Sequence, residues 1–553
     1  MNENEAAFQR YLHRLRALPE SEKREFREVL YAEAGIPAET VSGCESGRDA
    51  GRPGQLNRGC MRDTITKSDW LDAGQCLSMA WFGLRAAPIP PNEAERFRME
   101  QGQEVGALAR ELYPGGTLVS KRDGKTAVEI TQDLIADAAN ETIFEAAFHA
   151  GAFVAKADIL RRQDGAWHVL EVKSSFSDTS KIKELLDDLA YTVFVLRRAG
   201  QQITKAFLIL LSRTFRRGDG PDRLFEIIDK TDEANARVAE FDGAADNIAR
   251  ALFNEAPPTP KLVSACRNCT FFDNKCLGSG LAHTVLEIPG LHHTKLRRLS
   301  AGGIIDLSRV PDDLNLNERQ ERAKNAALSG NTVVEAGLRA ALESIQWPCH
   351  YLDFETVATV LPAYDGHGCH RQTLTQFSIH HRDSIDGEPR HSEYLADATK
   401  DCERELAEAL IEKLGDRGSI VVYGTFEGTR ITALRNEFPD LAERLQAILD
   451  RLKNLLAVIE NHVYHPGFRG SFSLKKVLPA LVPGFTYDGL DVKDGDTAIT
   501  RFARMARGEV SGAAVGVTRQ QLLDYCEMDT FAIVRLHETL YQLSAGTQRA
   551  GSA

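Results

Sequence analysis

The stretch Tyr351–Thr356 constrains the fold of this chain more than any other, because it places two carboxylates on one face of a short strand. Its sequence, YLDFET, leads into an apolar run and predicts a β-strand, in which every second side chain points the same way. Asp353 and Glu355 therefore share a face. Adjacent carboxylates repel one another unless a cation lies between them, and hard divalent ions prefer oxygen ligands. A metal site is one interpretation, and the polar edge of a half-exposed strand is the other.

Length and composition indicate several domains. With 553 residues the chain exceeds what one hydrophobic core holds, and we expect roughly three or four domains. No apolar run is long enough to span a bilayer, and the acidic start MNENE lacks the pattern of a secretory signal, which predicts a cytoplasmic protein without membrane contact. The net charge of −12 disfavours a generally polyanion-binding surface, but local basic clusters still allow nucleic acid as a partner.

The cysteines are spaced as metal ligands. Ten are present, and in a cytoplasmic chain they favour thiols or metal ligands over disulfides. Cys266, Cys269 and Cys276 fall in the string CRNCTFFDNKC, and thiolates so close together favour a soft metal or an iron–sulfur cluster. A fourth ligand has to come from elsewhere. Cys76 follows ITKSDWL, which predicts a capped helix with this cysteine on its final turn, although Cys76 taken alone is more typical of a small buried side chain.

A second acidic constellation precedes the cysteine string. The stretches FVAKADIL (153–160) and WHVLEVK (167–173) predict two strands joined by a tight Asp-Gly turn. Glu171 and Lys173 share a face of the second strand, and Asp158 comes from the first. The two carboxylates can hold a divalent ion, while the lysine can polarise a water or a phosphate. The alternative is a surface ion pair between Glu171 and Lys173.

These residues carry a family resemblance. Residues 61–280 resemble a RecB-type nuclease of the PD-(D/E)xK superfamily, in the branch whose four cysteines hold a [4Fe–4S] cluster. The resemblance implies that Asp158 and Glu171 bind Mg²⁺ or Mn²⁺ and that Lys173 is catalytic. It also implies that Tyr191, on the next helix, supports the site. The implied cluster ligands, with structural Zn²⁺ as the alternative occupant, are Cys76, Cys266, Cys269 and Cys276.

Two positions depart from that family pattern. Gly106 stands where histidine is common, so Glu104 is the candidate for the missing metal oxygen. Asp187 replaces a glutamine that is common in the helix motif before Tyr191. These changes bear on the number of metal ions that the site holds.

Residues 281–345 are predicted to form a helical linker. The run IPGLHHTKLRRLSAGGIIDL within them resembles a helix-hairpin-helix element, whose glycine-bearing turns offer backbone N–H groups to phosphates. An ordinary helical linker is the alternative.

The last part of the chain returns to the opening carboxylates. A predicted buried strand, 419–423, runs into a helix that carries Glu427 in its first turn, where the helix dipole favours a carboxylate in any case. Near the end, Tyr525 and Asp529 are four positions apart on one face of a predicted helix. Residues 346–545 resemble the RNase H-like 3′–5′ exonucleases of the DEDD group, in the subclass with a Y-x-x-x-D motif.

This second resemblance implies a site in which four carboxylates hold two Mg²⁺ or Mn²⁺ ions. Tyr525 would orient the attacking water, and Glu427 stands at the second motif, where aspartate is usual. Lys475, in a Ser/Leu-rich helix that resembles the one between the second and third motifs, is a candidate contact to backbone phosphates. The implied metal ligands are Asp353, Glu355, Glu427 and Asp529.

Together these patterns predict an α/β multidomain protein with a PD-(D/E)xK nuclease core and an RNase H-like mixed-sheet domain. The chain beyond residue 60 also resembles a bacterial family that fuses the two nuclease types. This resemblance implies a metal-dependent nuclease in DNA repair or anti-phage defence, which acts on DNA, with RNA as the alternative, from ends or on single strands and without sequence specificity. The alternative is a nucleic-acid-binding scaffold with one or both sites degenerate. The predicted parts are a helical arm and loop (1–60), the PD-(D/E)xK domain (61–280), the linker (281–345), the RNase H-like domain (346–545) and a tail (546–553).

Overall fold

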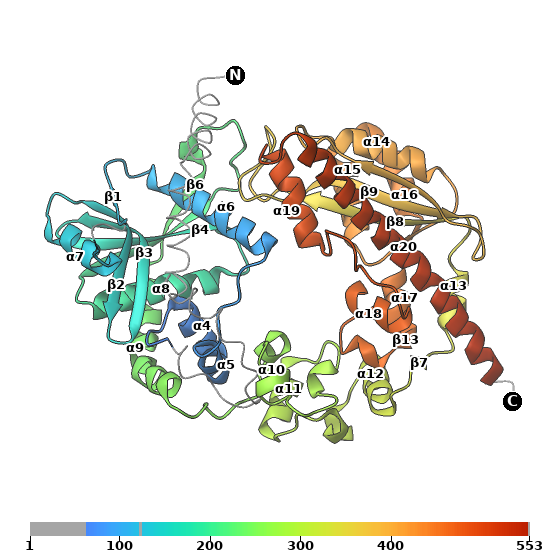
Figure 1. Cartoon of the computed structure of the whole chain (residues 1–553), viewed down its shortest axis with the longest axis horizontal. Coiled ribbons are helices and arrows are strands. Elements are labelled where there is room, and N and C mark those ends of the chain that lie inside the picture. The colour runs from blue at the N-terminus through green and yellow to red at the C-terminus, as the bar shows by residue number, and fades with distance from the viewer. Residues whose placement is uncertain (1–61, 121–123, 551–553) are drawn as a thin grey trace. The chain divides into compact units, whose positions relative to one another are not determined.

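The computed structural model describes residues 62–120 and 124–550, so the predicted arm over 1–60 and the last residues of the predicted tail lie outside it. The chain forms two compact units (Figure 1). The first runs to Phe271 and includes Val360–Cys369, and the second comprises Phe272–Thr359 and the residues from His370 onward. Each unit contains a mixed β-sheet flanked by helices, which confirms the predicted α/β multidomain class.

The first unit is built on a six-stranded mixed sheet in the order β1-β2-β3-β4-β5-β6. The predicted hairpin is confirmed, because β3 and β4 pair antiparallel as far as Gln163 and Ala166. Asp164 and Gly165 both have positive φ in the turn, the geometry that suits a two-residue hairpin loop. The strands are β1 (Thr117–Leu118), β2 (Thr142–Ala150), β3 (Phe153–Gln163), β4 (Ala166–Phe176), β5 (Ile203–Leu211) and β6 (Phe225–Asp229).

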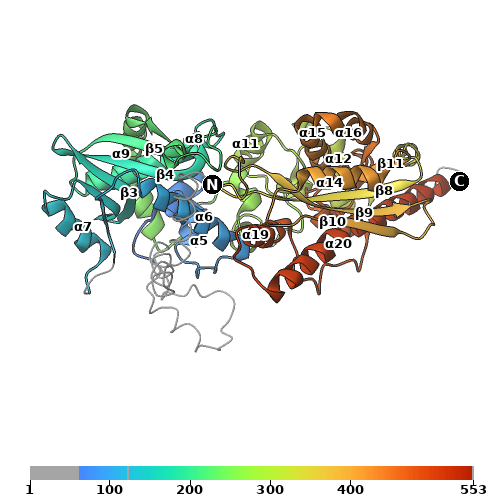
Figure 2. The ribbon, with the colours of Figure 1, turned by 90° about the horizontal axis from the view of Figure 1, so that it is seen from above.

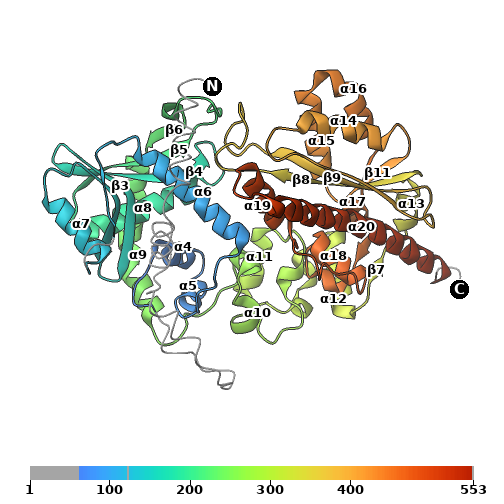
Figure 3. The ribbon, with the colours of Figure 1, turned by 45° about the horizontal axis from the view of Figure 1, so that its top comes forward.

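Helices cover both faces of this sheet, because its strands are apolar on both sides. Val169 belongs to the core on the face of α8 and α9, whereas the next residue, Leu170, belongs to the core on the opposite face. Figure 3 shows α6 lying across that opposite face. The predicted capped helix is confirmed as α4, with Thr66 as its N-cap and Cys76 directly after its last residue. The helices are α4 (Lys67–Gln75), α5 (Leu77–Gly83), α6 (Glu93–Arg110), α7 (Ala127–Ala136), α8 (Ile182–Arg198) and α9 (Thr231–Phe253).

The second unit is built on a five-stranded mixed sheet in the order β10-β9-β8-β11-β12. Its central strand, β8, contains the predicted strand Tyr351–Thr356 and pairs antiparallel with β9 and parallel with β11. The strand predicted at 419–423 is β11. The strands are β8 (Cys349–Val357), β9 (Thr373–Arg382), β10 (Arg390–Leu395), β11 (Ser419–Val422) and β12 (Leu452–Asn454), with β7 (Val333–Val334) and β13 (Val463–Tyr464) forming a separate pair.

Helices enclose this sheet from both sides. Figure 2 shows α14, α15 and α16 over one face and the long helix α20 over the other. Polar contacts attach α20 to the sheet, since Thr530 bonds to Ser378 and His380 through its hydroxyl group. The helices are α14 (Glu403–Leu414), α15 (Phe426–Glu437), α16 (Ala442–Leu449), α17 (Leu455–His462), α18 (Leu474–Leu481), α19 (Gly495–Ala506) and α20 (Ala513–Ala550).

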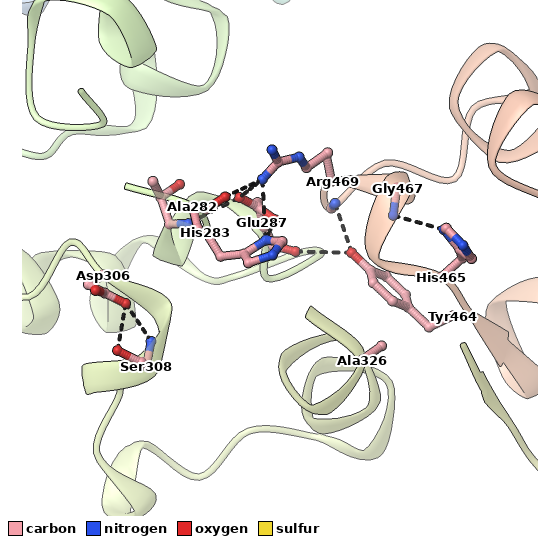
Figure 4. Close-up of polar contacts among 12 residues, drawn as sticks. Ala282, His283, Glu287, Asp306, Ser308, Ala326, Tyr464, His465, Gly467 and Arg469 are labelled. Carbon is pink, nitrogen blue, oxygen red and sulfur yellow. Dashed lines mark hydrogen bonds and ion pairs between the residues drawn. The ribbon is translucent and has the colours of Figure 1, made fainter. Parts of the chain in front are cut away.

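The residues predicted as a helical linker fold with the second unit. Arg469 donates from Nη1 to the carbonyl of Ala282 at 2.6 Å and pairs with Glu287 at 2.9 Å (Figure 4). Gly470 follows with φ of +81°, and a Cβ there would meet the Glu287 backbone at 2.8 Å, so only glycine allows this close approach. The phosphate-binding role of the turns stays a prediction. The helices of these residues are α11 (His293–Ala301), α12 (Glu318–Ser329) and α13 (Leu338–Glu343), and α10 (Phe272–Lys275) precedes them.

Membrane spans were also predicted to be absent. Within residues 62–120 and 124–550, none of the helices combines the length and the apolar character that crossing a bilayer requires, and this includes the 38-residue α20.

Candidate metal centres

Three of the predicted carboxylates of the second unit meet at one point. Asp353, Glu355 and Asp529 each offer an oxygen atom, and these atoms lie within 4.8 Å of one another. Asp353 and Glu355 share a face because β8 is extended, as predicted. Asp529 joins them from α20, which packs on that face of the sheet. The arrangement brings together strand and helix residues that are far apart in the chain.

Glu427, the fourth predicted carboxylate, is buried beside these three. It lies in the first turn of α15, directly after β11, the parallel neighbour of β8. The residue is 4% exposed, and its Oε2 atom is buried without a hydrogen-bond partner. The charge of Glu427 contributes to the raised pKa of Asp353, which indicates that the two carboxyl groups lie near one another. An orphaned carboxylate oxygen is costly in a protein interior, and a shared cation would remove that cost.

Burial raises the pKa of all four carboxyl groups, and repulsion from neighbouring carboxylates adds to this effect at Asp353 and Glu355. For Asp353 burial is the main cause, followed by the charges of Asp529 and Glu427. Burial also raises the pKa of Asp529 and that of Glu355, and it raises the pKa of Glu427 to about 7. Without a cation, these groups retain protons at a pH where carboxyls are ordinarily ionised. An all-oxygen donor set that gains from a positive charge fits Mg²⁺ or Mn²⁺.

Two phenols hold Asp529. Tyr525 lies on the same face of α20 and is hydrogen-bonded to this carboxylate, as its spacing predicts. Tyr487, from the segment before α19, donates its hydroxyl to Asp529 Oδ1 at 2.6 Å. Burial, with the charge of Asp529, raises the pKa of both phenols, so both remain neutral donors. Tyr487 was not predicted, because no motif in the sequence marks it.

Charged and polar neighbours complete this site. Lys475 is exposed on α18, and its positive charge partly offsets the rise in the pKa of both Glu355 and Asp529, which indicates that it lies near these carboxylates. The predicted contact of Lys475 with backbone phosphates stays a prediction. The Cys526 thiol approaches Asp353 Oδ2 at 3.8 Å. Asp494, the N-cap residue of α19, adds a further negative charge that raises the pKa of Glu355. The sequence alone marked neither Cys526 nor Asp494.

The first unit brings its own predicted residues together. Glu171 is 1% exposed on β4, and Lys173 Nζ lies 3.1 Å from its Oε1 atom. Asp158, on β3, accepts the backbone N–H of Val172 at 2.7 Å. Burial, with the charge of Glu171, raises the pKa of Asp158 to about 7. Burial alone would also raise the pKa of Glu171, but Lys67 and Lys173 together lower it to about 2.

Lys67 and Asp188 belong to this site as well, although neither was predicted. Lys67 Nζ lies 2.5 Å from Glu171 Oε1 and 3.4 Å from Asp188 Oδ2. Lys173 also pairs with Asp188. Lys67 comes 104 residues before Glu171, so no local spacing relates the two. The site therefore holds two lysines, where the sequence indicated one.

Comparison with known families covers part of the second unit. Residues 350–473 match a domain family of unknown function, DUF2779. The matched segment includes Asp353, Glu355 and Glu427 and ends before the helix that carries Tyr525 and Asp529. A search of curated proteins finds no match. The comparisons thus attach no activity to either site.

Tyr191 was predicted to support the first site, and its hydroxyl group contacts the segment before α4. Its hydroxyl group is buried and donates to the carbonyl of Ile65 at 2.7 Å. The Ile65 amide bonds in turn to the carbonyl of Ala152 at 2.7 Å. These bonds hold the segment that leads into α4, two residues before Lys67. Tyr191 therefore positions the start of α4.

Glu104 lies half-buried on α6. The neighbouring residue Val105 packs in a core with Val172, whose side chain is on the opposite side of β4 from that of Glu171. The role of Glu104 as a metal ligand stays a prediction.

The helix that follows Cys76 packs against the segment that leads to the other cysteines. Ser78 donates to the carbonyl of Pro258 at 3.0 Å, and Trp81 Nε1 donates to that of Asn254 at 2.9 Å. Cys266 follows shortly afterwards in a 3₁₀ turn, Ser264–Asn268, and is buried. Cys269 ends this turn, and Cys276 comes directly after α10. The [4Fe–4S] cluster, like its zinc alternative, stays a prediction.

Proposed function

We propose that the protein is a Mg²⁺- or Mn²⁺-dependent nuclease that hydrolyses phosphodiester bonds of nucleic acid, with one site in each unit. The convergence of Asp353, Glu355 and Asp529, with oxygen atoms within 4.8 Å of one another beside the orphaned oxygen of Glu427, carries this proposal. Carboxylates that lie this close repel one another, and a divalent cation between them relieves the repulsion. The resemblance to RecB-type and DEDD nucleases supports DNA over RNA as the substrate, in repair or in defence against phage.

In the second unit, Asp353, Glu355, Glu427 and Asp529 are the proposed ligands. Bound divalent ions would supply an activated water and stabilise the leaving oxygen. Tyr525 and Tyr487 are neutral hydroxyl donors that hold Asp529 in one orientation. Tyr525 has the further proposed role of orienting the attacking water. Lys475 supplies positive charge from an exposed position, which suits contact with a phosphate.

In the first unit, Asp158 and Glu171 are the proposed ligands, and Lys173 is the proposed catalytic lysine. Burial alone would lower the pKa of Lys173, but Glu171 and Asp188 raise it above its usual value. Lys173 therefore stays protonated, and its role is to stabilise charge on the phosphate instead of accepting a proton. The four predicted cysteines would hold a [4Fe–4S] cluster with a structural role, because the cluster would close a very long loop.

Cleavage of end-labelled nucleic acid tests the proposal. The full chain, with Mg²⁺ or Mn²⁺, should degrade DNA labelled at the 5′ or the 3′ end, in single- or double-stranded form, and RNA serves as the comparison. Asp353→Ala should remove one activity and Lys173→Ala another, whereas Asp416→Ala, which alters a side chain that is 97% exposed, should remove neither. Intact substrates in every reaction with the unaltered chain would contradict the proposal. Tight, salt-sensitive binding without cleavage would instead favour the nucleic-acid-binding scaffold.

A further inference from the structure

The ammonium group of Lys67 contacts Glu171 Oε1, the carboxylate oxygen that a divalent ion would need as a ligand in the first unit. Its Nζ lies 2.5 Å from Glu171 Oε1, and Lys173 Nζ lies 3.1 Å from the same atom. The other carboxylate oxygen, Oε2, faces the hydroxyl of Thr192 at 3.4 Å. Asp188 Oδ2 also contacts both lysines. Two carboxylates and two ammonium groups thus form one cluster of ion pairs, and Asp158 lies beside it.

The fold directs Lys67 into this cluster. Thr66 caps α4 and makes Lys67 its first helical residue. Just before it, Ile65 is held on both sides, because its amide bonds to Ala152 and its carbonyl accepts from Val154 and from the hydroxyl of Tyr191. The backbone of Lys67 is therefore fixed, while four rotatable bonds leave its ammonium group able to move. The side chain is 23% exposed, so its tip has a route towards solvent.

The two lysines are not held equally. Lys173 has its closest contact with Asp188, whereas Lys67 lies 3.4 Å from that carboxylate and has its closest contact with Glu171. If a divalent ion takes Glu171, Lys173 retains a partner at short range. Lys67 then loses Glu171, its closest partner, and the positive charge of the ion also repels the ammonium group of Lys67. Lys67 is thus the lysine that a metal ion displaces.

We infer that Lys67 is a displaceable counter-ion of the first site, which neutralises Glu171 until a divalent ion binds and then contacts the phosphodiester of the substrate. This inference rests on the proposed function of the same site. Lys67 competes with the metal in the free protein and adds a second cation beside Lys173 in the complex with nucleic acid. The site consequently binds metal more weakly than its carboxylates alone would, and substrate phosphate favours the loaded state.

Metal binding and cleavage measured on the same variants test the inference. Every protein in the comparison is the full chain with Glu355→Ala, which weakens metal binding in the second unit. Mn²⁺ affinity is measured from the electron paramagnetic resonance signal of free Mn²⁺. Lys67→Met and Lys67→Gln should each bind Mn²⁺ about tenfold or more tightly than the parent, because a charge-assisted contact no longer competes. Lys67→Arg keeps the charge and should bind no more tightly than the parent.

Two controls test whether loss of any lysine tightens Mn²⁺ binding and whether the tighter binding occurs at Glu171. Lys205→Met removes a lysine whose ion pair with Asp229, at 2.9 Å, lies away from the site, and it should leave the affinity unchanged. Adding Glu171→Gln to Lys67→Met should abolish the tighter binding. At saturating Mn²⁺, Lys67→Met should nevertheless cleave DNA about tenfold or more slowly, since a cation on the phosphate is lost.

Either measurement can overturn the inference. Lys67→Met and Lys67→Gln proteins that bind Mn²⁺ no more tightly than the parent, or not at all, would show that Lys67 does not compete with metal. Tighter binding with cleavage at the parent rate would show that Lys67 does not act on the substrate. Cleavage by the unaltered chain is measured separately, so failure of the inference is distinguishable from failure of the proposed function.

Discussion

Replacing Glu427 by glutamine is expected to stabilise the second unit when no metal is bound. Glu427 is 4% exposed, and one of its carboxylate oxygens has no hydrogen-bond partner. Its ionised form is therefore unfavourable in the folded protein, and burial is the cause. Glutamine has nearly the same shape and carries no charge, so the substitution removes this electrostatic penalty.

The size of the effect follows from the pKa. Burial raises the pKa of Glu427 from 4.5 to about 7, and each pKa unit corresponds to about 1.4 kcal/mol. Ionised Glu427 therefore lowers the free energy of unfolding by up to about 3 kcal/mol. Because the folded-state pKa is the higher one, the penalty is absent below about pH 4.5, grows as the pH rises and is complete above about pH 7. Glu427→Gln should thus stabilise the protein by about 1–3 kcal/mol at about pH 8 and have little effect at about pH 4.

Urea unfolding in EDTA at several pH values measures this difference. Hydrogen exchange of amides in β8 and β9 reports the second unit separately from the first. Glu443→Gln is the matched control, because Glu443 also lies in the first turn of a helix, α16, but is exposed. It should cost only a few tenths of a kcal/mol through the helix dipole. With Mn²⁺ added, the unaltered protein should gain more stability than Glu427→Gln. Destabilisation by Glu427→Gln above pH 7 in EDTA would refute the reasoning, because the ionised carboxylate would then have a partner.

Three further substitutions test other contacts. Tyr487→Phe removes a hydrogen-bond donor that lowers the pKa of Asp529. Mn²⁺ binding at neutral pH should therefore weaken several-fold, and the midpoint of its pH dependence should rise. An unchanged midpoint would count against this contact. Tyr191→Phe removes the bond to Ile65 and should lower the free energy of unfolding by about 1 kcal/mol, measured in urea, with no loss expected if the bond does not form. Cys266→Ser should reduce iron content and visible absorbance after anaerobic purification, whereas zinc in the unaltered protein would contradict the iron–sulfur proposal.

Local patterns were enough to predict several elements of both units. The hairpin of β3 and β4 follows from two apolar stretches and an Asp-Gly turn, because a two-residue turn with positive φ determines the pairing of its strands. The side-by-side placement of Asp353 and Glu355 follows from the two-residue repeat of an extended strand. That Tyr525 and Asp529 share a face follows likewise from helical spacing.

Contacts between segments distant in the chain were decided only by the tertiary structure. Lys67 reaches Glu171 because the bonds of Ile65 to Ala152, Val154 and Tyr191 fix the start of α4, and no periodicity links positions 104 residues apart. Tyr487 reaches Asp529 from a segment between helices that carries no regular repeat. The sequence by itself thus determined which carboxylates share a strand or helix face, since backbone geometry repeats over a few residues. Packing decided which cations and hydroxyl groups meet those carboxylates, because that depends on how whole elements come together.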